Sequence, residues 1–314
     1  MNEYEQVPET YETENDDFDA LYVVAWALII QALMRLIRLP PTINATQMLQ
    51  LERSVNTEIQ SVFSDLERKA IPLATEKVTN AYTEGVSFSQ SALSQDSKLN
   101  EVKPKKVTKK NLNDSHKERL QVMIDQTQED LLKATHNTQN NVKQLVRKVV
   151  SKEISNAGKS GRFGKQSAMA KQIEDQLRKQ FLENGIKDAD VAIIDKANRK
   201  WKLKTYSSMV ARTKMNNAYI QAIREEALQD GTDLAIISTK PDTYDACKNY
   251  EGMIISLNGL TAGYLTYEGI KATKQCFHPN CGHFVRPFSN IDRVPPKLKA
   301  IHESKMNNYR KENS

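Results

Sequence analysis

The sequence is poor in the residues that interrupt helices or cross-link small secreted domains. Glycine and proline are sparse, at 11 and 10 of 314 residues, which favours long helices over a turn-rich β fold. The cysteines are three, Cys247, Cys276 and Cys281, and an odd number excludes complete internal disulfide pairing. The N-terminus is acidic, the reverse of a secretory signal peptide. We therefore expect reduced thiols in a cytosolic setting.

The composition is that of a folded protein with a basic surface. Hydrophobic residues make up 39% of the chain and charged residues 27%, which is apolar enough to form a core. The length allows two or three domains. The net charge of +6 and the pI of about 9.0 suit contact with nucleic acid or with an acidic protein surface.

The first forty residues change abruptly in character. Residues 1–19 carry eight Asp and Glu and no Lys or Arg, which predicts an acidic disordered tail. Residues 20–41 form an apolar run that Pro40 and Pro41 end, and we expect a docking helix there. A membrane span needs about 20 predominantly apolar residues. We favour a helix that packs on a partner or on the rest of the chain. If the protein contacts a membrane at all, we expect the contact through residues 20–39.

Two long segments have helical periodicity. In 42–94, apolar residues recur at spacings of three and four on one face, and Pro72 should end or kink the helix. In 115–184, Ser115 and Glu118 form a capping-box pattern ahead of an amphipathic stripe, into which Thr127, Thr135 and Thr138 fit. The two segments fit either a coiled coil or a helical hairpin. A basic, glycine-rich break precedes a shorter helix expected at 166–183.

A basic linker, 95–114, lies between the two helical segments. It has little apolar content and is rich in lysine, including Lys103, Lys105, Lys106, Lys109 and Lys110. Such a stretch could contact phosphate backbones, or it could be a solvated loop. Both interpretations remain open.

The last third of the chain has a different pattern. After a helix at 206–228 that Gly231 should end, apolar runs at 234–239 and 252–257 predict two strands of a short β-hairpin. We expect 259–273 to be a loop and 291–314 a basic C-terminal tail. The fold class predicted is mainly α, with long N-terminal and central helices and a small C-terminal α+β domain over 185–290.

A Cys/His cluster closes this α+β domain. Cys276, His278, Cys281 and His283 lie within eight residues, and Cys247 comes from the loop between the two strands. Thiolate and imidazole groups are the ligands of tetrahedral zinc, and a metal would stabilise a domain with little core. However, the CxxC pair of a standard zinc finger is missing.

Two other interpretations of the cluster compete with a metal site. The residues could form a tight Pro-Asn turn with locally bonded histidines and cysteines buried as small hydrophobes. Cys281 with His278 or His283 could also be a nucleophile and base. A third group that would orient such a base is not evident, so we predict a protein that is not an enzyme.

The order of these motifs is similar to that of a known family. Arg199 to Leu203, a helix with Arg212 and Thr213, Glu251-Gly252, and a closing His-Pro-Asn-Cys turn follow one another over residues 185–288. This resembles the phage minor capsid protein 2 family and, more distantly, the Mu F-like head morphogenesis proteins. Structural motif residues carried over from the resemblance are Trp201, Arg212, Thr213, Glu251, Gly252, Pro279 and Asn280.

The family usually has a histidine and a CxxC pair in the loop before Glu-Gly. In this chain Cys247 falls on the second cysteine, Tyr244 on the first, and Lys240 on the histidine. Gly282 stands where the family usually has arginine. These departures remove expected ligands, and Cys276 is a candidate replacement.

The resemblance implies a structural minor capsid protein of a tailed bacteriophage. It would be a low-copy virion component near the portal, assembled in the bacterial cytoplasm, acting in head assembly or in DNA packaging and delivery. Its partners would be the portal and other capsid proteins, with DNA as a further candidate, zinc as the candidate cofactor and no small-molecule substrate. The alternatives are a nucleic-acid-binding module with a zinc-type site and a phage-associated nuclease or transferase.

Overall fold

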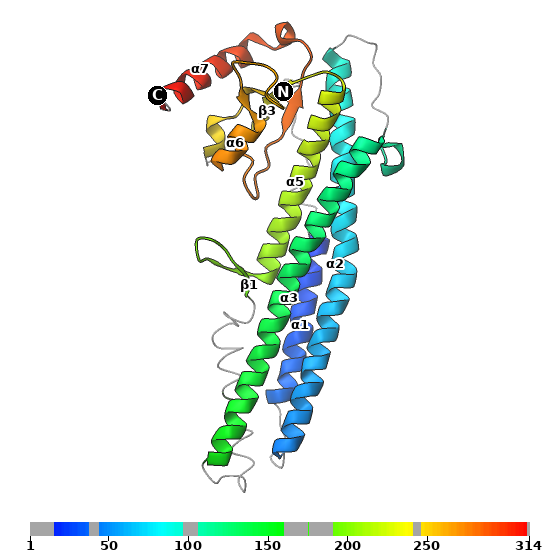
Figure 1. Cartoon of the computed structure of the whole chain (residues 1–314), viewed down its shortest axis with the longest axis vertical. Coiled ribbons are helices and arrows are strands. Elements are labelled where there is room, and N and C mark those ends of the chain that lie inside the picture. Colours follow the sequence, from blue (N-terminus) through cyan, green and yellow to red (C-terminus); the bar gives the residue numbers. More distant parts are fainter. Residues whose placement is uncertain are drawn as a thin grey trace. The chain divides into compact units, whose positions relative to one another are not determined.

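The computed structural model of the protein describes residues 16–37, 44–96, 106–159, 175, 191–240 and 246–312. The fold is mainly α with a small C-terminal α+β region, as predicted (Figure 1). The chain divides into two compact units. Among the described residues, unit 1 holds 75–127 and 209–312, and unit 2 holds 16–74 and 128–208. Helices α2, α3 and α5 contribute residues to both units.

Unit 2 is built on helices packed side by side. Its helices are α1 (Asp16–Ile37), the first part of α2 (Ala45–Asp96) and the later part of α3 (Asp114–Lys159). Glu67 pairs with His136, and Gln60 accepts a hydrogen bond from Lys143. The residue number of the α3 partner rises as that of the α2 partner falls, so the two helices form an antiparallel helical hairpin. The threonines predicted on the α3 stripe are buried and donate to carbonyls one turn earlier.

One expectation about unit 2 is wrong. Asp16 to Asp19 belong to α1 and not to a disordered tail, because Phe18 is fully buried against the bundle. Of the two effects expected of Pro72, it does not end the helix, since α2 continues through it. Proline inside a helix costs about 3 kcal/mol, and here the buried neighbours Ala70 and Ala74 keep the chain packed on both sides of it. Residues 1–15 lie outside the described part of the chain.

Helix α1 has one buried face and one exposed face. Phe18, Tyr22 and Ile29 are buried in unit 2, and burial raises the pKa of Tyr22 to about 12. Val23, Val24 and Leu28 are exposed. The helix is long and apolar enough to cross a membrane, but a helix from a soluble core passes the same test. The buried aromatic face indicates that α1 packs on the rest of its unit.

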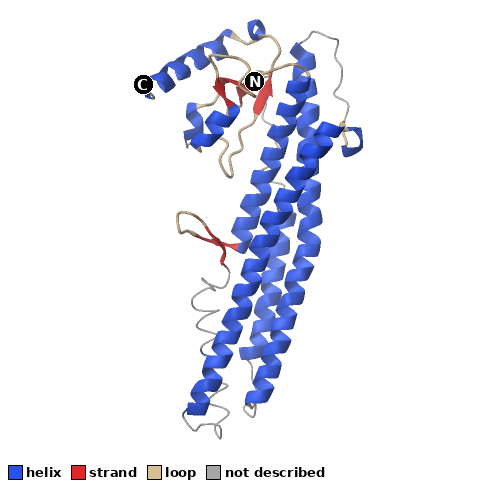
Figure 2. Ribbon diagram, in the orientation of Figure 1, coloured by secondary structure: helices blue, strands red, loops and turns tan. Residues whose placement is uncertain are grey.

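Unit 2 also contains a β-hairpin that the sequence pattern did not predict. Strand β1 (Val191–Ile194) pairs antiparallel with β2 (Lys200–Lys202). Two asparagines of α3 fix the hairpin, because the Asn137 and Asn141 side chains donate to the carbonyl oxygens of Ala192 and Val191 at 3.1 and 2.8 Å. Its strands are separate from those of the larger sheet (Figure 2).

In unit 1, α5 (Leu203–Gln229) packs closely on α2. A Cβ atom on Gly85 would lie 2.4 Å from the carbonyl oxygen of Tyr219. The Ser89 hydroxyl donates to the carbonyl of Ile223. The first turns of α3 complete this layer, where Tyr82 and the buried ring of His116 share a 2.9 Å hydrogen bond. An apolar cluster around Val86, Ile124 and Met215 fills the space between these helices.

Helix α3 begins on a different cap from the one predicted. Asn113 is the capping residue, since its side-chain oxygen accepts the backbone N–H of His116. Ser115 instead donates to Glu225 on α5. The capping-box prediction is therefore wrong, because Asn113 is an equally good cap and Ser115 has a tertiary partner.

A four-stranded sheet carries the C-terminal region. Its order is β5 (Leu265–Thr266), β4 (Ile254–Ser256), β3 (Leu234–Ile237) and β6 (Val285–Pro287). The antiparallel pairing of β3 with β4 confirms the predicted hairpin. Alternate residues face opposite sides: Ala235 and Ile237 join the core with α5, whereas Ile236 packs with Leu298. Burial on both faces explains the unbroken apolar run.

The predicted tail and loop of this region are wrong. Residues expected to be a basic tail form η6 (Ile291–Arg293) and α7 (Pro296–Glu312), and Leu298 and Met306 are buried. Residues expected to be a loop contain β5 and α6 (Tyr267–Thr273). These elements are short or polar, so their periodicity in the sequence is weak and tertiary packing decides their structure.

The described part of the predicted linker is ordered. A short η2 helix (Lys109–Asn111) precedes Leu112, which is buried in the helical core of unit 1. The earlier linker residues 97–105, including Lys103 and Lys105, lie outside the described part of the chain. So does the helix expected at 166–183, apart from Asp175.

Candidate metal centre

The structure brings the three cysteines and one histidine of the predicted cluster together. Cys247 comes from η5 (Ala246–Asn249), and Cys276, Cys281 and His283 come from the segment between α6 and β6. Their ligand atoms all lie within 4.8 Å of one another, and all four residues are buried. The sequence placed these residues in two loops about thirty positions apart, and the pairing of β3 with β4 and β6 closes that distance.

A tight turn delivers Cys281 to the cluster. The backbone N–H of Cys281 donates to the carbonyl of His278 at 2.9 Å, and Asn280 has a positive φ of 62°. Proline followed by asparagine at the two central positions is the preferred composition of such a turn. The Pro-Asn turn that was an alternative to a metal site is therefore part of the same geometry.

Helix α5 holds this turn from behind. The buried side-chain amide of Asn216 donates to the carbonyl oxygens of Cys281 at 2.7 Å and of His283 at 3.1 Å. The Thr213 hydroxyl accepts the backbone N–H of Asn280. Arg212, next to it, is exposed on the helix. The sequence carries no signal for Asn216, since nothing marks one asparagine on a helix as a tertiary donor.

Glu251 orients the histidine ligand. Its Oε1 atom lies 2.9 Å from Nε2 of His283 and accepts the backbone N–H of Lys240 at 3.0 Å. The other ring nitrogen, Nδ1, lies 3.4 Å from the sulfur of Cys281. Gly252 follows with a φ of +72°, a conformation that favours glycine. The Glu-Gly motif thus supplies one hydrogen-bonding side chain and one backbone turn.

Hydrogen bonds within the cluster shift the pKa of its members. Hydrogen bonds from Cys276 and His283 outweigh burial and lower the pKa of Cys281. For Cys276, the hydrogen bond with Cys281 and burial both raise the pKa. Burial lowers the pKa of His283, but Cys281 and Glu251 outweigh it and raise that pKa. The same hydrogen bonds that join these side chains therefore stabilise a thiolate within the cluster.

The donor set fits a tetrahedral metal ion. Zinc–sulfur and zinc–nitrogen bonds of about 2.3 and 2.0 Å place ligand atoms roughly 3.5–3.8 Å apart. The Cys247 and Cys281 sulfurs are 3.6 Å apart, and the Cys281 sulfur is 3.4 Å from Nδ1 of His283. The carboxylate behind the histidine is the usual partner of a metal-bound imidazole. The cluster could hold a metal through three thiolates and one imidazole.

His278 lies beside this set. Its Nε2 atom is 3.2 Å from the sulfur of Cys247, and its Nδ1 atom is 2.8 Å from the carbonyl oxygen of Pro279. It is half-buried and does not belong to the group of four whose ligand atoms lie within 4.8 Å.

Trp201, a further motif residue, lies on β2 in unit 2, where its indole nitrogen donates to Asp195.

Lys240 occupies the space next to the closing turn. A Cβ atom on Gly282 would lie 2.4 Å from the Lys240 ammonium nitrogen. The resemblance places arginine at 282 and histidine at 240, so two departures from the family pattern meet at one point. The lysine supplies positive charge where the arginine is missing, and glycine leaves room for it.

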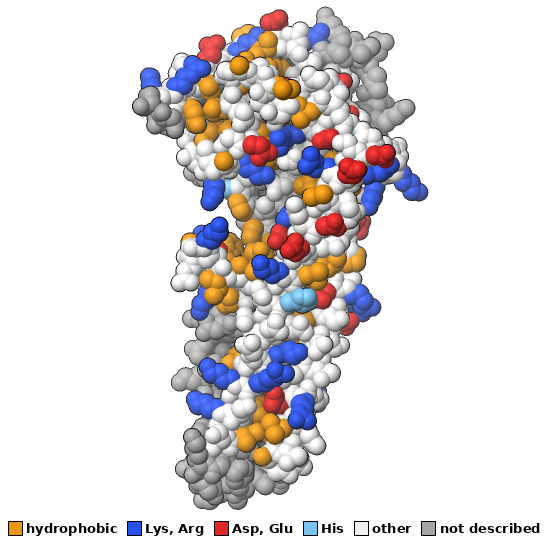
Figure 3. Space-filling model, viewed as in Figure 1, with side chains coloured by type: hydrophobic (Ala, Val, Ile, Leu, Met, Phe, Trp, Pro, Cys, Tyr) orange, Lys and Arg blue, Asp and Glu red, His pale blue; other side chains and the backbone are white. Residues whose placement is uncertain are grey.

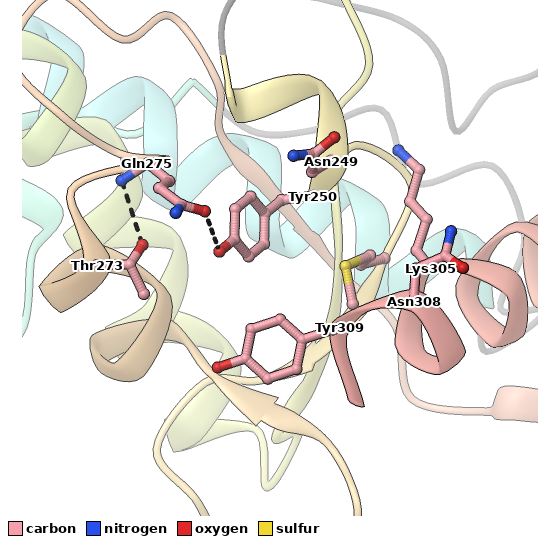
Figure 4. A pocket seen from close by; sticks show the side chains of 8 residues that line it. Asn249, Tyr250, Thr273, Gln275, Lys305, Asn308 and Tyr309 are labelled. Atoms are coloured by element: carbon pink, nitrogen blue, oxygen red, sulfur yellow. Dashed lines mark hydrogen bonds between the residues drawn. The ribbon is translucent and has the colours of Figure 1, made fainter. Parts of the chain in front are cut away.

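A pocket of about 370 Å³ lies next to the cluster. The rings of Tyr250 and Tyr309 border its open space, and the Tyr250 hydroxyl donates to Gln275 at 2.8 Å (Figure 4). Lys305 of α7 lines it and donates to the carbonyl oxygens of Lys248 and Glu251. Burial lowers the pKa of Lys305. The lysine therefore ties α7 to the loop that carries Cys247.

The other predicted binding residues belong to the linker. Lys106, Lys109 and Lys110 are exposed and lie away from the Cys/His cluster in sequence. Lys and Arg side chains are spread over the visible face of the molecule among Asp and Glu (Figure 3).

Comparison with protein families matches residues 8–313 to the model described as phage minor capsid protein 2. The match covers nearly the whole chain, which is wider than the 185–288 region that carries the motifs. No match was found among curated proteins or among solved structures.

Proposed function

The chain belongs to the phage minor capsid protein 2 family, and it is thus a structural component of the phage capsid that contacts other virion proteins. For a protein of this kind we propose that a bound zinc ion holds the C-terminal α+β region together. The observation that carries this proposal is the buried group of Cys247, Cys276, Cys281 and His283 with ligand atoms within 4.8 Å. Zinc would supply cross-linking of loops and no chemistry, since four protein ligands close its coordination shell.

The residues around the cluster support a structural role for the metal. Cys247 lies in the loop after β3, and the other three ligands lie between α6 and β6. The sheet itself has strands of two to four residues, so its ladders alone are short. A metal that joins these loops would contribute free energy of folding directly. The group that would orient a catalytic base, not evident in the sequence, is present, because Glu251 bonds to His283 next to Cys281. We still infer that the protein is not an enzyme, because a metal held by all four side chains would occupy the Cys281 sulfur and the His283 nitrogen.

Metal content and stability test the zinc proposal. Elemental analysis of purified full-length protein should give about one zinc per chain, and Cys281→Ser or His283→Ala should lower that ratio severalfold. His136→Ala is the matched control, because that exposed histidine pairs with Glu67 in unit 2. Chelation should lower the unfolding temperature of the parent protein. Protein that is free of transition metals and equally stable with and without chelator would overturn the proposal.

We further propose that the protein sits near the portal of the capsid and acts in head assembly or DNA packaging, after assembly in the host cytoplasm. Family membership supports this placement. The exposed apolar side chains of α1, Val23, Val24 and Leu28, offer a contact surface for the portal. Deleting the whole helix would remove its buried face as well, so changes confined to its exposed side chains are the sharper experiment.

Incorporation into virions tests the docking role of α1. Val24→Glu together with Leu28→Glu should reduce the amount of this protein in purified phage heads several-fold. Val122→Glu is the control, since Val122 is exposed to a similar extent, 50% against 57% for Val24. Equal incorporation of the double variant and the parent would show that α1 does not dock.

A further inference from the structure

The β1–β2 hairpin presents a concentrated positive charge. Residues 194–204 contain five basic residues and one acidic residue, Asp195. The basic residues are exposed: Lys196, Arg199, Lys200, Lys202 and Lys204. Lys200 and Lys202 occupy alternate positions of one short strand and so point to the same face. This segment was recognised in the sequence for its family resemblance and not for its charge.

The single carboxylate of the hairpin is used internally. Asp195 Oδ1 accepts the backbone N–H groups of Ala197 and Arg199, and Oδ2 accepts the Trp201 indole N–H at 3.0 Å and the Arg199 side chain at 2.7 Å. The hydrogen bonds from Trp201 and from the Arg199 backbone hold the pKa of Asp195 well below its usual range. Asp195 therefore fixes the turn and offsets the charge of Arg199, while the four lysines of the segment are exposed.

The base of the hairpin is anchored. Val191 and Ala192 are buried, and Asn137 and Asn141 of α3 hold their carbonyl groups. Residues 131–152 of α3 contain five Lys and Arg and no Asp or Glu. Lys133 and Lys148 are exposed and share the helical face of the two asparagines by their spacing. The hairpin thus rises from a helix surface of the same sign of charge.

We propose that the β1–β2 hairpin binds the phosphate backbone of duplex DNA. Lysines are point charges suited to phosphate without reading sequence, and the major groove of about 12 Å admits a two-stranded ribbon. An anchored base lowers the entropy lost on binding. None of the hairpin's residues belongs to the candidate metal centre or to the linker lysines first considered for DNA contact.

Salt-dependent binding of the full-length protein to a short mixed-sequence DNA duplex tests the proposal. Each phosphate contact adds about 0.9 to the slope of log K against log salt. A triple variant should lower that slope by roughly 2–3 and weaken binding at least about tenfold at low salt. It combines Lys196→Gln, Lys200→Gln and Lys202→Gln. Arg199 is left intact because it bonds to Asp195 and stacks on Trp201.

The matched control removes the same charge elsewhere. The variant with Lys69→Gln, Lys274→Gln and Lys297→Gln also lowers the net charge by three, and these lysines are exposed and belong to no proposed binding site. The control should bind DNA with nearly the parent slope. Equal losses in both variants would show that net charge alone drives binding. No binding by the parent protein at about 50 mM salt, or an unchanged hairpin variant, would overturn the proposal.

Trp201 offers a local readout. The chain has two tryptophans, Trp26 and Trp201, so Trp26→Phe leaves the indole of the hairpin as sole reporter. DNA should change its fluorescence in that variant, and the change should disappear when the three hairpin lysines are replaced. Polyglutamate at matched charge serves as a competitor for the labelled duplex. If it competes as strongly as unlabelled DNA, the surface suits an acidic protein and the proposal is overturned. Metal content is measured separately, so failure here leaves the zinc proposal standing.

Discussion

The Nε2 atom of His283 lies 2.9 Å from the carboxylate of Glu251, which turns Nδ1 toward the sulfur of Cys281. Glu251 is itself fixed by the backbone N–H of Lys240. The Glu-Gly motif and the closing turn, thirty residues apart in sequence, therefore act on one imidazole ring. Through this relationship the carboxylate acts on the site without being one of the four candidate ligands.

Replacing Glu251 should weaken zinc binding without removing a ligand. Glu251→Gln keeps an oxygen acceptor but loses the charge that raises the basicity of His283, and such changes cost about 10–100-fold in metal affinity. Competition titration with a zinc chelator measures the effect. Glu268→Gln is the control, because that exposed carboxylate pairs with Arg224. Identical affinities of Glu251→Gln and the parent would contradict the orienting role.

Removing the amide of Asn216 should loosen the closing turn. Asn216→Ala leaves the carbonyl groups of Cys281 and His283 without their buried donor, which costs about 1–3 kcal/mol. Peptides covering 276–284 should exchange amide hydrogen faster in the variant. Asn307→Ala, on the exposed side of α7, should leave their exchange unchanged. Unaltered exchange in Asn216→Ala would show that other contacts hold the turn.

Gly85 allows α2 and α5 to approach closely. A methyl group there would meet the Tyr219 carbonyl oxygen at 2.4 Å and the Ala222 side chain at 2.8 Å, and overpacking of this kind costs about 1–3 kcal/mol. Helix propensity alone predicts the opposite sign, a gain of about 1 kcal/mol. Hydrogen exchange of α5 peptides in Gly85→Ala decides between the two, since a more protected helix would exclude the steric contact.

The contact of Glu226 with His116 should make unit 1 sensitive to acid. Burial raises the pKa of Glu226, but hydrogen bonds from His116 and Gln90 outweigh it and lower that pKa below its ordinary 4.5. A lowered folded-state pKa contributes stability that is present above the unfolded pKa and lost as the pH falls through the folded one. Urea unfolding should show Glu226→Gln less stable than the parent at neutral pH, with the difference shrinking below about pH 4.5.

A pH-independent difference between Glu226→Gln and the parent would instead assign the effect to packing. Glu303→Gln serves as the comparison, because Glu303 is exposed on α7. Its stability difference from the parent should be small at every pH.

The sequence by itself determined the elements with strong periodicity. The stripe of three- and four-residue spacings predicted the helices that became α2 and α3, and β-branched runs between turns predicted β3 and β4. The ordered motifs of the last third also indicated the family. These features depend on local patterns, which a chain carries whatever its tertiary contacts.

Tertiary structure alone decided which residues meet. Helix α7 and strands β1, β2, β5 and β6 are short or polar, so packing selected them over weak local preference. The sequence named Cys247, Cys276, Cys281 and His283 as candidates, but only the sheet register placed their ligand atoms within 4.8 Å and set Asn216 and Glu251 behind them. Distances between loops depend on the whole fold, and no spacing in the chain encodes them.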